Sequence, residues 1–280
     1  MAMMKATNSH REKVYRAYMS FFEHAERHRR WSLFDDIPWE KLDASTNDPQ
    51  LALGAETFCG VEMYLPDYLA AGINIVRESF GQAWFQANWG YEESKHSLAL
   101  REYLLRSGQR TDEQFAAFER AIYANTWNRP FLTARQMTCY GCIQEATTFL
   151  MYRKQGEVAE RLNDVVLKTI YDLLARDEAA HAGFYQIELK LEMEEDREGT
   201  LRDLAHVFAN FYMPGMGLVP DYDERIKYMR SAGVDRNVFL RDVWFRLLRQ
   251  LGTSRSEVAK HRAAIVEPAE PMPAIVVVSK

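Results

Sequence analysis

The sequence predicts an all-α protein built from long helices. Apolar residues recur at three- and four-residue steps, as in "LNDVVLKTIYDLLARDEAAHAGFYQIELKLEME", and this is the period of an amphipathic helix. The chain has only 9 Pro and 14 Gly in 280 residues, and the polar/apolar alternation of strands is nearly absent. With 47% hydrophobic and 27% charged residues, it also has the material for a sizeable core.

Periodicity and end signals place the helices in order. Gly108 ends one helix, Thr111 caps the next, and Arg129-Pro130 opens another. The expected helices cover about 11–30, 51–78 with Pro66 in its interior, 80–106, a segment after Thr111, 129–156 and 158–193. A shorter helix should end before "MPGMGLVPDY", and two or three more should fill 223–265.

No stretch of the chain marks a linker between independently folding units. We therefore expect a single helical domain over residues 1–265. The last residues, "VEPAEPMPAIVVVSK" (266–280), are rich in Pro and then in β-branched residues. This composition predicts an extended C-terminal tail that lies on the body or is partly free.

Composition excludes several classes of protein. Three cysteines, an odd number, cannot build a disulfide framework, which favours a reducing, cytoplasmic setting. The N-terminus lacks the pattern of a signal peptide, and no stretch approaches the roughly 20 apolar residues that span a bilayer. We expect no membrane insertion. The net charge of -5 argues against nucleic acid as the main partner.

Charge is nevertheless uneven along the chain. Residues 222–265 contain ten Lys or Arg against five Asp or Glu. Two interpretations stay open. The run is either a set of solvated helix faces or a docking face for an acidic partner.

Two of the expected helices carry the same short motif. "EESKH" contains Glu93 and His96, and "RDEAAH" contains Glu178 and His181. A Glu and a His three residues apart lie on one helix face, one turn from each other, so both can reach a common point in a bundle interior. The motif therefore predicts two equivalent contributions to one site.

Each motif follows a helix with an isolated glutamate. Glu62 lies 31 residues before Glu93, and Glu145 lies 33 residues before Glu178. A lone carboxylate on an apolar helix costs several kcal/mol if it is buried without a partner. Either such a residue reaches water at the surface, or it is paired with a cation. The similar order and spacing of the two halves favour a pseudo-two-fold arrangement around a cation site.

Four carboxylates and two imidazoles match the ligand set of di-iron and di-manganese carboxylate bundles. Hard oxygen donors combined with imidazole suit iron. Zinc is a lesser possibility, since closed structural zinc sites use four ligands, commonly with Cys. The single pair Cys139-x-x-Cys142 is weak evidence for another metal site, because both cysteines also suit a buried helix face.

These motifs resemble those of the soluble acyl-acyl-carrier-protein desaturases, over about residues 31–251. "VEMYLPDY" is similar to the family's Glu-x-x-Leu-Pro-x-Tyr, and "EESKH" to Glu-Glu-Asn-Arg-His. "IQEATTF" is similar to Gln-Glu-Arg-Ala-Thr-Phe, and "RDEAAH" to Ala-Asp-Glu-Lys-Arg-His. The resemblance implies a ferritin-like four-helix bundle core with additional flanking helices and two iron ions as cofactor.

The resemblance also implies a role for each matching residue. Glu93 and Glu178 would bridge the irons, Glu62 and Glu145 would each bind one, and Thr148 would lie at the oxygen-binding face as a catalytic residue. The implied metal ligands are Glu62, Glu93, His96, Glu145, Glu178 and His181.

Three further residues are expected around the ligands. Glu92 and Asp177 each precede a bridging Glu, and we expect them to accept the outer N–H of the ligating imidazoles. Trp31 resembles a family tryptophan that is linked to the cluster through an Asp and a His, here Asp177 and His96. A core aromatic is the alternative interpretation of Trp31.

The implied function is an O2-dependent desaturase that introduces a cis double bond into an acyl chain on acyl carrier protein. Two electrons would come from a ferredoxin-type donor, and the protein would be a homodimer. The carrier is acidic, so the arginines from Arg225 to Arg249 are a candidate docking face. The alternatives are a di-iron oxygenase, for hydroxylation or N-oxygenation, and a non-catalytic iron-binding bundle.

Overall fold

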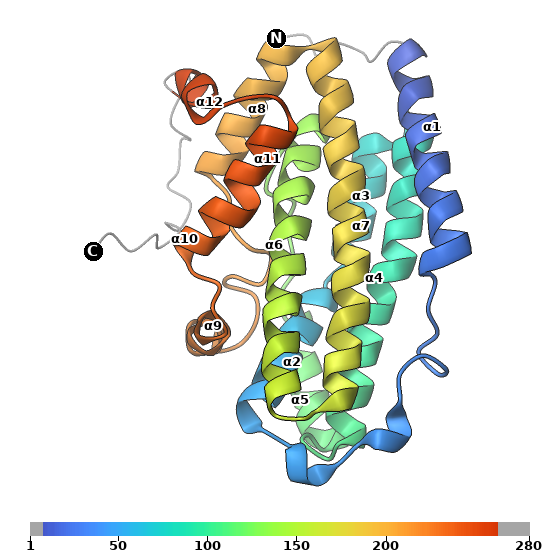
Figure 1. Ribbon diagram of the computed structural model, residues 1–280, viewed down its shortest axis with the longest axis vertical. Helices are drawn as coiled ribbons and strands as arrows, with labels where there is room; N and C mark the ends of the chain where they lie inside the picture. The colour runs from blue at the N-terminus through green and yellow to red at the C-terminus, as the bar shows by residue number, and fades with distance from the viewer. Residues whose placement is uncertain (1–7, 263–280) are drawn as a thin grey trace.

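The computed structural model describes residues 8–262, and this part of the chain contains helices and no strand. Four long segments form the central bundle: α2 (Pro49–Glu62), α4 (Phe80–Arg106), α6 (Ala134–Arg161) and α7 (Val165–Glu195) (Figure 1). The all-α bundle is confirmed. The expected tail at 266–280 lies outside the described residues, and the single unit over 1–265 stays a prediction.

The N-terminal helix packs along one side of the bundle. α1 (Asn8–His24) continues into one π-helical turn, Ala25–Arg29, and lies against α4 and α7 (Figure 1). The approach to α4 is close, because a Cβ placed on Gly81 would lie 2.7 Å from the backbone nitrogen of Tyr15. Glycine at this position therefore sets how near α1 comes to the bundle.

The expected helix over 51–78 is wrong, since two helices occupy this stretch. α2 ends at Glu62, and α3 (Leu65–Val76) begins three residues later with Pro66 in its first turn. Proline has no N–H to donate to the carbonyl of residue 62, and its fixed φ suits the start of a helix. Pro66 therefore begins α3 and leaves Glu62 at the free end of α2.

The turn after α4 follows the sequence signals. Gly108 has a left-handed φ of 72° and ends the helix. Thr111 and Gln114 then form a reciprocal capping box: the Gln114 amide donates to Thr111 Oγ1 (3.2 Å), and the Thr111 amide donates to Gln114 Oε1 (2.9 Å). This box opens α5 (Asp112–Tyr123) and confirms the cap at Thr111.

The expected boundaries of the next two helices are wrong by several residues. α6 begins at Ala134, where Thr133 accepts a hydrogen bond from the Gln136 amide (3.2 Å), rather than at Pro130. It also continues through Gly156, because that glycine packs against Tyr171 within the bundle and tertiary contact outweighs its low helix propensity. α7 begins only after the Asp164 cap.

The remaining helices flank the bundle beside α6 (Figure 1). They are α8 (Arg197–Ala209), α9 (Tyr222–Ser231), a contiguous run of α10 (Arg236–Val238), the π-helical η4 (Phe239–Trp244) and α11 (Phe245–Gln250), and α12 (Arg255–Arg262). The expectation of two or three helices after residue 222 is confirmed. Among residues 8–262, no helix is long and apolar enough to cross a membrane.

Candidate metal centre

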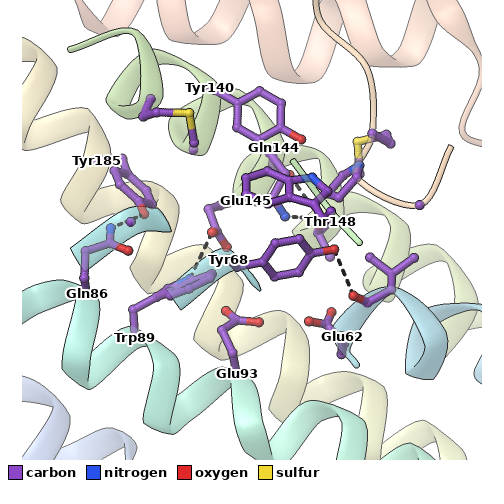
Figure 2. Close-up of a pocket in the computed structure, with 18 of the residues that line it drawn as sticks. Glu62, Tyr68, Gln86, Trp89, Glu93, Tyr140, Gln144, Glu145, Thr148 and Tyr185 are labelled. Atoms are coloured by element: carbon purple, nitrogen blue, oxygen red, sulfur yellow. Dashed lines mark hydrogen bonds between the residues drawn. The ribbon is translucent and has the colours of Figure 1, made fainter. Parts of the chain in front are cut away.

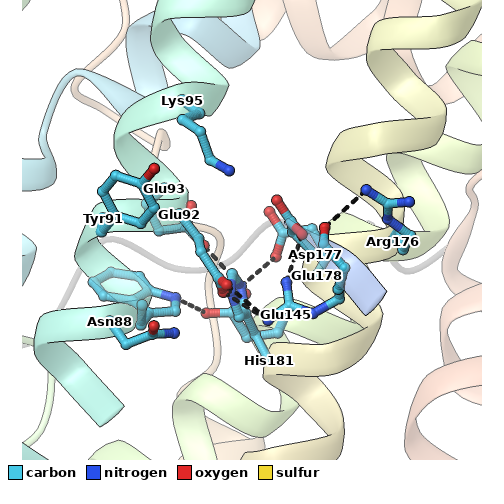
Figure 3. A network of polar contacts seen from close by, with 12 residues as sticks. Asn88, Tyr91, Glu92, Glu93, Lys95, Glu145, Arg176, Asp177, Glu178 and His181 are labelled. Atoms are coloured by element: carbon cyan, nitrogen blue, oxygen red, sulfur yellow. Dashed lines mark hydrogen bonds and ion pairs between the residues drawn. The ribbon is translucent and has the colours of Figure 1, made fainter. Parts of the chain in front are cut away.

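Six acidic and histidine side chains from four helices meet inside the bundle (Figures 2 and 3). Their potential ligand atoms fall into two groups, and all atoms within a group lie within 4.8 Å of one another. Both groups contain Glu93 and Glu178. The first adds Glu62 and His96, and the second adds Glu145 and His181. All six residues are buried, so the bundle holds two adjacent sites, each of which could hold a metal ion.

The local helix geometry explains how these groups converge. Glu93 and His96 lie one turn apart on α4, with His96 Nδ1 3.2 Å from Glu93 Oε2. Across the bundle, His181 Nδ1 of α7 lies 2.9 Å from Glu93 Oε1. Both imidazoles therefore turn Nδ1 towards the shared carboxylates and Nε2 outwards.

Most of the inward-facing atoms have no hydrogen-bond partner within the described residues. The atoms without a partner are Glu93 Oε1, His96 Nδ1, Glu145 Oε2, Glu178 Oε2 and His181 Nδ1. Buried polar atoms are normally paired, and each unpaired one costs free energy. Lone pairs that converge without partners, on carboxylates and imidazoles, fit a pair of divalent cations.

The charges of the centre also favour a pair of divalent cations. Burial raises the pKa of Glu62 and Glu178 well above the usual range, and the negative charge of Glu93 raises both further. Burial acts to lower the pKa of His96 and His181, but the surrounding carboxylates outweigh it and raise both values. Four carboxylates packed this closely need added positive charge, which two divalent cations would supply.

Glu92 and Asp177 lie where the sequence placed them, on the outer side of the imidazoles. Glu92 Oε2 is 2.7 Å from His181 Nε2 (Figure 3), and Asp177 Oδ2 is 3.5 Å from His96 Nε2. Each helix thus supplies the outer acid for the histidine of the other. An acid at Nε2 fixes the proton there and leaves the Nδ1 lone pair free for a metal.

Trp31 is also found beside this shell. Its Nε1 donates a hydrogen bond to Asp177 Oδ2 (2.7 Å), and the indole is 6% exposed. Trp31, Asp177 and His96 therefore form a connected chain from the segment after α1 to the centre. The Lys95 ammonium lies 4.4 Å from the Trp31 ring centroid and covers the indole on one side.

The structure adds Arg29, which sequence reasoning missed. Its guanidinium is buried, donates two hydrogen bonds to Glu92 (2.8 and 2.9 Å) and pairs with Asp177. One cation therefore joins both outer acids. The only signal was the position of Arg29 two residues before Trp31.

Two aromatic donors at the single glutamates were also missed. Trp89 Nε1 donates to Glu145 Oε1 (3.0 Å; Figure 2), and Tyr152 Oη donates to Glu62 Oε1 (2.6 Å). Each bond holds one carboxylate oxygen and aims the residue. Trp89 lies one turn before Glu93 on α4, so helical spacing from the known motif was the available signal.

A pocket reaches the centre, and Glu62, Glu93 and Glu145 form part of its wall (Figure 2). α3 and α6 supply much of the remaining lining. Thr148 also lines it, one turn from Glu145; its hydroxyl donates to the Gln144 carbonyl (3.1 Å). The arrangement brings Thr148 to the pocket, and its catalytic role stays a prediction.

Two other groups noted in the sequence, the arginines from Arg225 to Arg249 and the three cysteines, lie outside the metal centre. Arg225 is wrong as a docking residue, because it is buried and paired with Glu56 (2.9 Å) inside the protein. The exposed arginines of this region are Arg230, Arg236, Arg241, Arg246 and Arg249. Cys59, Cys139 and Cys142 are free and buried, and neither metal-site group contains them.

Comparison with known proteins agrees with this architecture. The sequence model of a family described as fatty acid desaturase matches residues 61–250. DesA1 of Mycobacterium tuberculosis, provisionally named an acyl-[acyl-carrier-protein] desaturase, is 24% identical over 266 residues, covering 85% of this chain and 75% of that protein. Stearoyl-[acyl-carrier-protein] 9-desaturase 6 of Arabidopsis thaliana is 30% identical over 136 residues, 46% of this chain and 33% of its own length.

A solved structure shows the same fold. DesA2 of Mycobacterium tuberculosis H37Rv, also provisionally named an acyl-ACP desaturase, superposes with a TM-score of 0.68 at 15% identity, over 91% of this chain and 99% of its own. The fold is therefore the ferritin-like helical bundle of that protein. Because the family model spans well over half of the sequence, the chain belongs to the fatty acid desaturase family.

Proposed function

We propose that the protein is an O2-dependent di-iron desaturase that introduces a cis double bond into an acyl chain carried on acyl carrier protein. One observation carries the proposal. Two Glu/His groups that share Glu93 and Glu178 lie buried at the wall of a large pocket. Family membership and the names of the relatives support the acyl substrate and its carrier.

The residues fit two iron ions. Glu93 and Glu178 would be shared by the two sites, Glu62 and His96 would complete one site, and Glu145 and His181 the other. Four carboxylates balance the charge of two Fe²⁺ ions, and oxygen with imidazole suits iron. Bound iron would supply, with O2, the oxidation of an unactivated C–H bond that acid–base side chains cannot perform.

The chain's own residues position and protect this chemistry. Glu92 lies 2.7 Å from the Nε2 atom of His181, Asp177 faces the Nε2 atom of His96 at 3.5 Å, and Arg29 pairs with both acids. Trp89 and Tyr152 orient the single glutamates. The pocket wall of α3 and α6 would hold the acyl chain beside Glu145 and Thr148 and limit access of bulk water.

The partners belong to the same proposal. The exposed arginines of α9 to α11 (Arg230, Arg236, Arg241, Arg246 and Arg249) form a basic face for the acidic carrier. A ferredoxin-type electron donor, a homodimer and a cytoplasmic location rest on the family resemblance and the sequence composition.

Iron loading followed by turnover tests the proposal. Anaerobic titration should bind two Fe²⁺ per chain, and Glu145→Gln should lose this stoichiometry. Glu157→Gln, on the same helix but 42% exposed, should keep it. The reduced protein is then given acyl-carrier substrates of several lengths and O2, and products are weighed by mass spectrometry.

Loss of two hydrogens from the acyl chain is the expected result. Gain of one oxygen would instead make the protein an oxygenase that uses the same centre. Iron uptake without oxygen consumption linked to substrate would make it an iron-binding bundle. A protein that binds no iron contradicts the whole proposal.

A further inference from the structure

One end of the pocket is polar, which a plain acyl chain does not require. Five polar residues from three helices form this part of the wall: Gln82 and Gln86 of α4, Thr138 of α6, and Tyr185 and Glu188 of α7. The Gln86 amide donates to Tyr185 Oη (2.8 Å). An alkyl chain with a methyl end would have to bury that end against these groups.

Glu188 is the charged member of this group and lies well away from the metal-site residues. It follows His181 by seven residues, which places it two turns, or about 10 Å, further along α7. Thr138 precedes Glu145 by the same number of residues on the antiparallel α6, so both side chains mark the same end of the pocket. The mechanism described above uses neither residue.

Glu188 is buried and incompletely paired. Its carboxyl group is 3% exposed, and Oε1 has no hydrogen-bond partner within the described residues. Burial raises its pKa to about 8, and the charge of Glu192 acts in the same direction, while Gln82 and Thr138 partly oppose the shift through hydrogen bonds. The groups that act on Glu188 are thus neutral or negative, and a cation is what they lack.

We propose that the acyl substrate bears a primary amine and that Glu188 binds its ammonium group at this end of the pocket. The inference rests on the proposed function for one point, that the substrate is an acyl chain. An ammonium has three donors. Glu188, the Gln82 amide oxygen and the Thr138 hydroxyl offer it three acceptors. As the ammonium arrives, the carboxyl group releases its proton to solvent and forms a charge-assisted hydrogen bond.

Other end groups fit less well. A methyl end leaves Glu188 Oε1 without a partner, and a carboxylate would meet the charges of Glu188 and Glu192. A hydroxyl group can donate only one hydrogen bond and brings no compensating charge. The expected order of affinity is therefore amine, then alcohol, then carboxylate.

Binding to the iron-loaded, full-length protein under nitrogen tests this order without turnover. Octylamine, octanol and octanoate are titrated by calorimetry or by fluorescence of Trp89 and Trp127, which both line the pocket. Octylamine should bind at least about tenfold more tightly than octanol. Glu188→Gln should remove this preference, since it keeps the shape of the side chain and cannot become charged.

Glu194→Gln is the matched control. Glu194 is an acid six residues further on α7, but it pairs with Lys13 at the surface (2.7 Å) and is not part of the pocket lining. This variant should keep the preference for octylamine. Circular dichroism checks that each variant folds; if Glu188→Gln does not fold, the order of the three ligands on the unchanged protein still decides.

Equal affinity for octylamine and octanol overturns the inference, as does a preference that survives Glu188→Gln. If Glu188 faces the pantetheine arm of the carrier instead, Glu188→Gln would weaken amino- and methyl-terminated acyl carriers alike, and this also overturns it. A protein that binds octylamine through Glu188 but desaturates nothing would contradict only the proposed function.

Discussion

Arg29 connects the surroundings of the two imidazoles. Its side chain is 4% exposed and lies between Glu92 and Asp177, each of which faces one histidine. Glu92 also pairs with Arg30, and Asp177 also accepts a hydrogen bond from Trp31, but Arg29 pairs with both carboxylates. The orientation of both histidines therefore depends in part on a residue that pairs with the outer acids rather than with the imidazoles.

Replacing Arg29 tests this dependence. Arg29→Leu should lower the free energy of unfolding by about 3–5 kcal/mol, because it breaks two buried ion pairs and leaves the negative charges of Glu92 and Asp177 less compensated. Arg29→Lys should lose less, since it keeps the charge but not the planar fork that reaches two acids. Urea unfolding of the iron-loaded protein measures both.

Arg27 provides the matched control for this experiment. Arg27 pairs with Glu23 at the surface (2.9 Å), and both side chains are more than half exposed. Arg27→Leu should leave the urea midpoint almost unchanged. Equal losses for the two arginines would mean that the Arg29 cluster contributes no more than a surface pair.

Contacts between residues that are close in the sequence were predictable, whereas contacts between residues far apart in the sequence were not. Glu93 and His96 lie three residues apart, so their common face follows from helical geometry alone. Arg29 meets Glu92 and Asp177 across 63 and 148 residues, and no local pattern encodes such contacts. Glu188 was equally hidden, because a lone Glu on a helix is usually solvated.

Among the helices, the packing of α1 against α4 determines where Arg29 and Trp31 lie. Gly81 permits this close packing, since a Cβ atom at that position would lie 2.7–2.8 Å from backbone atoms of Tyr15. Backbone atoms cannot turn aside as a flexible side chain can. The first helix must therefore move if residue 81 gains a side chain.

A pair of glycine substitutions tests this packing. Gly81→Ala should destabilise the protein by about 1–3 kcal/mol through overpacking. Gly183→Ala, inside α7, should stabilise it by up to about 1 kcal/mol, because nothing lies within 4 Å of the added Cβ and alanine favours the helix. Thermal unfolding compares the two.

Opposite signs are expected from these two variants. If Gly81→Ala stabilises the protein as Gly183→Ala does, α1 and α4 are not as close as the structure places them. Gly81→Ser serves as a check on Gly81→Ala, since a still larger side chain should cost at least as much.

Helix existence was predictable, whereas several boundaries were not. Thr111 and Gly108 act through local capping, and both signals were correct. Gly156 looked like a helix end but packs against Tyr171, a contact that only the folded bundle supplies. Pro66 was expected in the interior of one helix, whereas it lies in the first turn of a new helix, α3.

For the whole molecule, the buried centre joins four helices that would otherwise repel one another there. α2, α4, α6 and α7 each bring at least one carboxylate to it. Bound divalent cations would turn this repulsion into attraction between the helices. Stability of the entire bundle should therefore depend on metal.

Removing iron tests this coupling. When free Fe²⁺ is about 1,000 times its dissociation constant, binding should add about 4 kcal/mol to the free energy of unfolding. A chelator should therefore lower the unfolding temperature under nitrogen, as measured by calorimetry. In Glu178→Gln, which removes a carboxylate shared by both groups, the chelator should change the unfolding temperature much less. An identical shift in both proteins would contradict a metal site at these residues.

α3 forms part of the pocket wall, yet none of its twelve residues is buried. Ile75 and Val76 line the pocket and are only partly buried, so replacing them reshapes the cavity at little cost in packing energy. The helix that tolerates substitution, α3, is thus separate from the helices that carry the metal-site residues. Substitutions in α3 can therefore change which substrates the pocket accepts without disturbing the carboxylates and histidines on α2, α4, α6 and α7.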